Sequence, residues 1–201
     1  MRRPKSHTPL PPLNRAAYHD EVDTLISTTL KINPDPLKRL AALSRLVNEN
    51  RRLAGVGRRR RDELAFILAF HEDLTGLHAA IGVNRTRFYE MRCDALLLTD
   101  AERAGKWLLG PDGESAEQRW ERISARATAV GIRWSQNAYH QLPLVAEKVY
   151  RHDLIATLAR EERDRIVADL ITEGWDRPAI AAIIGRNPSR ISQMKRRTVA
   201  A

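Results

Sequence analysis

The chain has 201 residues, of which 34 are Lys or Arg and 25 are Asp or Glu, so its formal net charge is +9. A hydrophobic content of 43% is enough to fill a core, yet no run approaches the roughly 18 apolar residues that a bilayer span needs. These numbers exclude a disordered tail and a membrane-spanning protein. They leave a basic globular protein whose favoured partner is a polyanion.

The single cysteine, Cys93, excludes an internal disulfide and a cysteine-based zinc site, and it indicates a reducing compartment. Residues 1–13 are basic and proline-rich but contain no apolar segment of the kind found in signal peptides, so we expect a flexible arm. Both features favour a cytoplasmic protein without a membrane partner.

Apolar residues recur at spacings of three and four along most of the chain, and no useful stretch alternates with period two, which predicts an all-α fold. Asp35 followed by Pro36 is typical of a helix start, and the apolar stripe after it extends to residue 47. A second helix is expected at about 59–70, followed by the segment 73–92 discussed below.

Two capping boxes, Thr99 with Glu102 and Ser115 with Gln118, predict further helix starts. Between them, the turn-forming sequence GPDGE marks a domain boundary. Longer helices are expected at about 144–158 and 161–173, with two short ones beyond 176. We therefore predict two helical domains, each ending in a helix-turn-helix: an arm at 1–13, an N-terminal domain at 14–98 and a C-terminal domain at 99–201.

An internal repeat is the most informative feature of the sequence. Shifting the chain by 103 positions aligns 73–92 with 176–195 without a gap, and seven of the 20 pairs are identical. The identities include a glycine, Gly82 or Gly185, where a first short helix must end, which often requires positive φ. They also include Asn84 or Asn187, an asparagine that can cap a second helix. This pattern predicts a helix-turn-helix in each copy.

The second helix of each copy has a polar outward face with hydroxyl, amide and guanidinium groups, which hydrogen-bond to base edges and phosphates. Glu90 either accepts a hydrogen bond from a cytosine amino group or repels phosphate, and the sequence leaves both readings open. Cys93 is expected on the same outward face. The predicted DNA contacts are Arg85, Thr86, Arg87, Tyr89, Glu90 and Arg92 in the first copy, and Ser189, Arg190, Ser192, Gln193, Lys195 and Arg196 in the second.

A run of four arginines, Arg58, Arg59, Arg60 and Arg61, lies at the expected start of the helix that precedes the first motif. Cations at a helix N-terminus are mildly unfavourable because of the helix dipole. This placement favours a compensating role in contacting phosphates.

Both segments resemble the bacterial helix-turn-helix of transcriptional regulators and of sigma-factor region 4, and the first half also resembles small helix-turn-helix proteins of actinomycetes. The second copy matches through Ala181, Gly185, Ile191 and Met194, with Arg186 in place of the usual aliphatic residue. The first copy keeps Gly82, Val83, Phe88 and Met91, with His78 in place of a small alanine. In this family the second helix lies in the major groove, so the resemblance implies DNA binding.

The sequence thus predicts a sequence-specific double-stranded DNA-binding protein that regulates transcription. No phosphate-binding glycine loop is present, and the six histidines lack ligand spacing, so we expect neither catalysis nor a metal or cofactor. The four tryptophans are expected to anchor the core. The alternatives are an adaptor or sigma-like factor that contacts RNA polymerase, and a plasmid or chromosome maintenance factor. The sequence does not indicate the oligomeric state, the target DNA or an effector.

We predict that Gln193→Ala relaxes base preference at a cost of about 1 to 3 kcal/mol, because an amide that reads a base edge is lost. Replacing Arg59 and Arg60 should instead weaken binding to all sequences alike, because phosphate contacts carry no base preference. A gel-shift titration against cognate and random duplexes measures both effects. Unchanged binding in both variants would exclude these surfaces.

Overall fold

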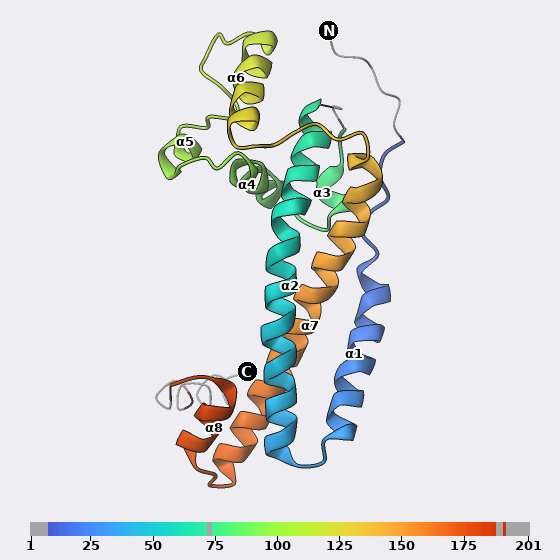
Figure 1. The fold of residues 1–201 in the computed structure, drawn as a ribbon, viewed down its shortest axis with the longest axis vertical. Helices are drawn as coiled ribbons and strands as arrows, with labels where there is room; N and C mark the ends of the chain where they lie inside the picture. The colour runs from blue at the N-terminus through green and yellow to red at the C-terminus, as the bar shows by residue number, and fades with distance from the viewer. Residues whose placement is uncertain (1–7, 72–73, 188–190, 192–201) are drawn as a thin grey trace. The chain divides into compact units, whose positions relative to one another are not determined.

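The computed structural model describes residues 8–71, 74–187 and 191. It is mostly helical and contains no strand among these residues, which confirms the all-α prediction (Figure 1). The helices are α1 (Arg15–Ile32), α2 (Pro36–His71), α3 (Leu77–Ala80), α4 (Arg85–Ala95), α5 (Asp100–Ala104), α6 (Ala116–Ala129), α7 (Ala138–Thr172) and α8 (Arg177–Ile184).

The chain forms two compact units that interleave along the sequence. Among the described residues, the first unit comprises 8–13 and 56–149, and the second comprises 14–55, 150–187 and 191. The chain passes from one unit to the other within α2, after Gly55, and within α7, after Val149. The boundary expected at 98/99 therefore lies inside the first unit.

Two pairs of expected helices are each one continuous helix. The segment expected to separate 35–47 from 59–70 is helical, so α2 runs unbroken over 36 residues, and α7 runs unbroken over 35. Glycine lowers helix stability without removing a backbone hydrogen bond, so Gly55 and Gly57 do not interrupt α2. The arginine run thus lies inside a helix, and the dipole argument made for it from the sequence is wrong.

Local capping signals are confirmed where the structure describes them. Asp35 Oδ1 accepts from the backbone N–H groups of Leu37 and Lys38 at 2.7 and 3.0 Å. Thr99 and Ser115 each form the full reciprocal capping box with the Glu or Gln three residues later. These side chains satisfy backbone donors that have no partner within the helix.

The first unit is built around the C-terminal part of α2, with α3 to α6 gathered about it (Figure 1). Its core side chains come from five helices and from the segments that follow α3, α4, α5 and α6. They include Phe66, Leu77, Met91, Leu96, Ile123 and Leu142.

The second unit packs α1 and α8 on the remaining parts of α2 and α7. Val22 and Ile26 of α1 lie in one cluster with α2 and α7 residues. Ile180 and Ile184 of α8 lie in another cluster with Leu170 of α7 and with Ile191. Each helix therefore buries one stripe, as the spacing of three and four predicts.

The expectation that all four tryptophans anchor the core is wrong for three of them. Trp107 packs partly buried against the first core. Trp120, Trp134 and Trp175 are 40%, 46% and 42% exposed. Trp120 still stacks on Phe70, with ring centroids 6.1 Å apart, so it covers the edge of the core.

We predict different outcomes for two neighbouring glycine substitutions in α2. Gly55→Ala should raise the free energy of unfolding by about 0.5 to 1 kcal/mol, because alanine restricts the unfolded chain and a Cβ at Gly55 meets nothing within 4 Å. In Gly57→Ala the new Cβ would lie 2.7 Å from Val149 Cγ2. Valine has little rotamer freedom, so the overpacking cancels the stabilisation that alanine would otherwise give. Urea denaturation measures both values, and equal stabilisation would contradict the packing at Gly57.

Candidate nucleic-acid interface

The turn between α3 and α4 is closed by two backbone hydrogen bonds around a left-handed glycine. Gly82 has φ 69°, and its N–H donates to Ala79 O at 3.1 Å. The N–H of Val83 donates to His78 O at 2.8 Å. This pair of bonds is the Schellman closure, which satisfies carbonyls at the end of a helix and reverses the chain.

The same closure ends α8, at positions 103 residues further along. Gly185 has φ 62°, and its N–H donates to Ala182 O at 3.4 Å, while Arg186 donates to Ala181 O at 3.0 Å. Other helices of the chain end in a similar way, so the closure alone does not establish a repeat. The register of burial agrees as well. Leu77 and Ile81 are buried in the first copy, as are Ile180 and Ile184 in the second.

Asn84 caps α4 as predicted. Its side-chain oxygen accepts from the N–H of Arg87 at 2.7 Å. In the second copy the corresponding helix lies beyond Asn187 and is not described. The predicted contacts Ser189, Arg190, Ser192, Gln193, Lys195 and Arg196 all lie outside the described residues.

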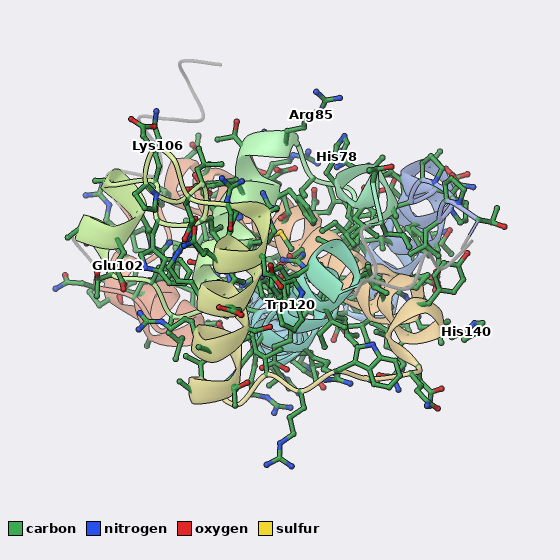
Figure 2. All side chains as sticks on the ribbon, turned by 90° about the horizontal axis from the view of Figure 1, so that it is seen from above. His78, Arg85, Glu102, Lys106, Trp120 and His140 are labelled. Atoms are coloured by element: carbon green, nitrogen blue, oxygen red, sulfur yellow. The ribbon has the colours of Figure 1, made fainter. Side chains whose placement is uncertain are left out.

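The first turn of α4 carries the exposed cations of the candidate interface. Arg85, Thr86 and Arg87 are exposed, and so is Glu90 in the next turn. Arg85 projects away from the ribbon in Figure 2 and has no hydrogen bond or ion pair with any described residue. The N-terminus of α4 thus presents a cation and a hydroxyl to solvent, next to the positive end of the helix dipole.

Tyr89 and Arg92 are more enclosed than the sequence predicts. Both are half-buried, and the Arg92 guanidinium lies over the rings of Phe88 and Tyr89, 5.2 and 5.8 Å from their centroids. Burial lowers the pKa of Arg92 and raises the pKa of the Tyr89 hydroxyl. These two side chains therefore pack against neighbouring groups of the protein and present little surface to a ligand.

Cys93 is not on an outward face, contrary to the expectation from the helical wheel. Its side chain is 1% exposed and belongs to the core of the first unit. Burial raises the pKa of its thiol. Other elements of the first unit cover this turn of α4, and the wheel of an isolated helix does not represent that cover.

An ion-pair network along α4 was missed by the sequence analysis. Arg87 Nη1 lies 2.8 Å from Glu90 Oε2, and Arg87 Nη2 lies 3.6 Å from Asp94 Oδ2. Asp94 Oδ1 in turn lies 2.7 Å from Arg103 Nη1. The hydrogen bond that Arg87 donates to Glu90 raises the pKa of Arg87, and the charges of Asp94 and Glu90 raise it further. The sequence does carry a signal for this network, because Glu90 and Asp94 follow Arg87 by three and seven residues and can lie on the same face of the helix.

The four arginines of α2 do not form one surface. Arg58, Arg59 and Arg60 are exposed; Arg59 pairs with Glu63, and Arg60 donates to Gln141 at 2.8 Å. Arg61 is only 8% exposed.

Arg61 instead completes a buried contact. Its guanidinium lies 2.9 Å from Asp62 Oδ1 and contacts Met91 Sδ of α4 at 3.8 Å. Burial raises the pKa of Asp62, and the charge of Arg61 opposes that rise. The prediction that Arg61 contacts phosphate is corrected, because this side chain neutralises a buried carboxylate.

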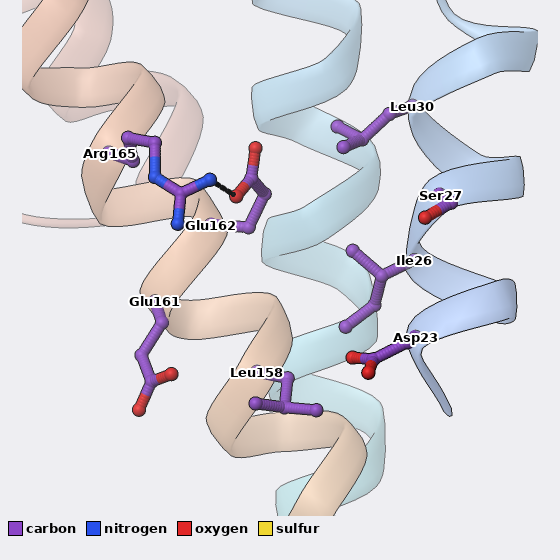
Figure 3. Close-up of a pocket in the computed structure, with 8 residues that line it drawn as sticks. All are labelled: Asp23, Ile26, Ser27, Leu30, Leu158, Glu161, Glu162 and Arg165. Carbon is purple, nitrogen blue, oxygen red and sulfur yellow. Dashed lines mark hydrogen bonds and ion pairs between the residues drawn. The ribbon is translucent and has the colours of Figure 1, made fainter. Parts of the chain in front are cut away.

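A groove in the second unit runs between α1 and α7 (Figure 3). Each helix contributes four residues at helical spacing, and three of the eight are acidic. Glu162 pairs with Arg165 at 2.5 Å, which leaves the carboxylates of Asp23 and Glu161 without a cation in the described part of the chain. Such a lining disfavours a polyanion, so this groove is no candidate for nucleic acid.

Within the described ranges, no three His, Cys, Asp or Glu side chains come close enough together to hold a metal ion. None of the described helices combines the length and apolarity required to cross a bilayer. Comparison with protein-family models, with curated proteins and with solved structures found no match to this chain.

We predict that Asn84→Ala lowers the free energy of unfolding by about 1 kcal/mol, because the N–H of Arg87 loses its acceptor. Asn84→Ser should retain most of the stability, since a serine hydroxyl also caps well. Urea denaturation of the three proteins tests the cap. Equal losses in the alanine and serine variants would show that Asn84 does not act through capping.

Proposed function

We propose that this protein binds double-stranded DNA through two helix-turn-helix elements, at 73–92 and 176–195, and regulates transcription without catalysing a reaction. The observation that carries the proposal is the left-handed glycine closure before α4, followed by a capped helix whose first turn exposes Arg85, Thr86 and Arg87. The matching closure at Gly185 supports a second element of the same kind.

The dimensions of α4 support this function. Its 11 residues span about 16 Å at about 1.5 Å per residue. A helix is about 10 to 12 Å across with its side chains, which fits a major groove about 12 Å wide. In helix-turn-helix proteins the N-terminal residues of the second helix contact base edges. Arginine and threonine at this position of α4 supply hydrogen-bond donors for guanine and for phosphate. The phosphate contacts would fix the position of the helix along the duplex.

The exposed arginines of α2 add sequence-independent affinity. The Arg59 side chain is 76% exposed, and its pairing with Glu63 is an exposed ion pair of the kind that exchanges at little cost. The net charge of the whole chain, +9, also favours a polyanion such as DNA as the partner.

A protein-interaction adaptor, with RNA polymerase as one partner, is the second candidate function. Glu90 and Asp94 on α4 favour it, because carboxylates oppose a phosphate backbone and can pair with basic residues of a protein. Failure to bind duplex DNA, together with a stable complex with the polymerase, would favour this candidate.

We predict that Arg85→Ala weakens binding of the full chain to a labelled random-sequence duplex and reduces the slope of log K against log salt by about 0.9, because one phosphate contact is lost. The matched control is Arg133→Ala, which removes the same charge from an exposed position between α6 and α7. Fluorescence anisotropy at several salt concentrations measures both slopes. Equal slopes for the two variants would exclude α4 as the DNA-binding helix.

A further inference from the structure

The exposed face of α4 carries charges of both signs, and they are paired selectively. Arg87 donates to Glu90 at 2.8 Å, with side chains 46% and 48% exposed. Arg85, two residues earlier, has no such partner among the described residues. One of the two arginines at the start of α4 is therefore already neutralised in the unbound protein.

The charge of Glu90 is compensated by Arg87 alone among the described residues, whereas the charge of Asp94 is also compensated by Arg103. Asp94 is held by Arg103 at 2.7 Å and lies 3.6 Å from Arg87. Glu90 has no cation other than Arg87 in the part of the chain that the structure describes. If Arg87 turned to a phosphate, the carboxylate of Glu90 would face the DNA without compensation.

We propose that the Arg87–Glu90 ion pair makes phosphate binding by α4 conditional on base recognition, with Glu90 as the specificity-determining residue. The inference rests on the proposed function, in which α4 contacts duplex DNA. When Glu90 accepts a hydrogen bond from a base, its charge is satisfied and Arg87 is released to a phosphate. On other sequences Arg87 stays paired, or Glu90 remains uncompensated.

The base that fits Glu90 is cytosine. Its N4 amino group is a donor in the major groove, and a carboxylate is the acceptor that pairs with it. Adenine also has an amino donor, but its neighbouring N7 is an acceptor that repels a carboxylate. The proposal therefore commits to a cytosine opposite Glu90.

The strength of the ion pair sets the size of the effect. Exposed pairs of this kind are weak, equivalent to about a fivefold change in affinity at most. The exchange is thus easily reversed, and it shifts the balance between cognate and random sequences without blocking either. It adds discrimination chiefly by lowering the affinity for random DNA.

The test is Glu90→Gln in the full chain, which removes the charge and keeps the shape of the side chain. We expect affinity for a random duplex to rise about two- to fivefold and the salt slope to steepen by up to about 0.9, because Arg87 becomes available. Selection from randomised duplexes should yield a fixed cytosine with the wild type, and the cytosine should no longer be fixed with the variant, because an amide does not share the carboxylate's preference for the cytosine amino group.

Glu121→Gln on α6 is the matched control, since it removes the same charge from an exposed residue of the same unit. It should leave the salt slope and the selected sequence unchanged. If Glu90→Gln behaves like this control, the inference is overturned, while a weakened Arg85→Ala variant still supports DNA binding by α4. If the wild type does not bind duplex DNA, the proposed function and the inference both fail.

Discussion

The left-handed backbone at Gly82 is the constraint on which the candidate interface depends. Two hydrogen bonds close the end of α3 around it, and Asn84 then caps α4 two residues later. Ile81 before the turn and Met91 after it are both buried in one core, so the direction of α4 is fixed from both sides. The exposure of Arg85 follows from that direction, because the first turn of α4 extends past the core.

Signals confined to a few residues allowed correct predictions, and signals that depend on distant packing did not. The caps at Asp35, Thr99 and Ser115 and the turn glycines were predictable because donor and acceptor lie within five residues of each other. The continuity of α2 was not predictable from the sequence, because Gly55 and Gly57 resemble the glycines that end helices. The helix continues through them because α2 packs in one unit before Gly55 and in the other unit after it.

The candidate site was predicted only in part, for a geometric reason. Four consecutive residues on a helix point in directions about 100° apart, so a run of arginines cannot lie on one face. Arg61 therefore faces the core and neutralises Asp62, while Arg59 faces solvent. The expectation that Cys93 faces outward was also wrong, because other elements of its unit bury this side chain. The spacing of three residues between Arg87 and Glu90 indicates an ion pair on α4, yet Arg87 was predicted as a cation available to DNA.

The interleaving of the two units bears on how the chain is synthesised and how it can be divided. A ribosome releases residues in order, so every described segment of the first unit has emerged once Val149 has left the exit tunnel. The segment 14–55 is made early, yet its partners in α7 and α8 come only after 150. Until those partners are made, Val22, Leu43 and Val47 lack the α7 residues of their core. A fragment that ends at 98 would leave neither unit whole, because each unit also takes residues from α7.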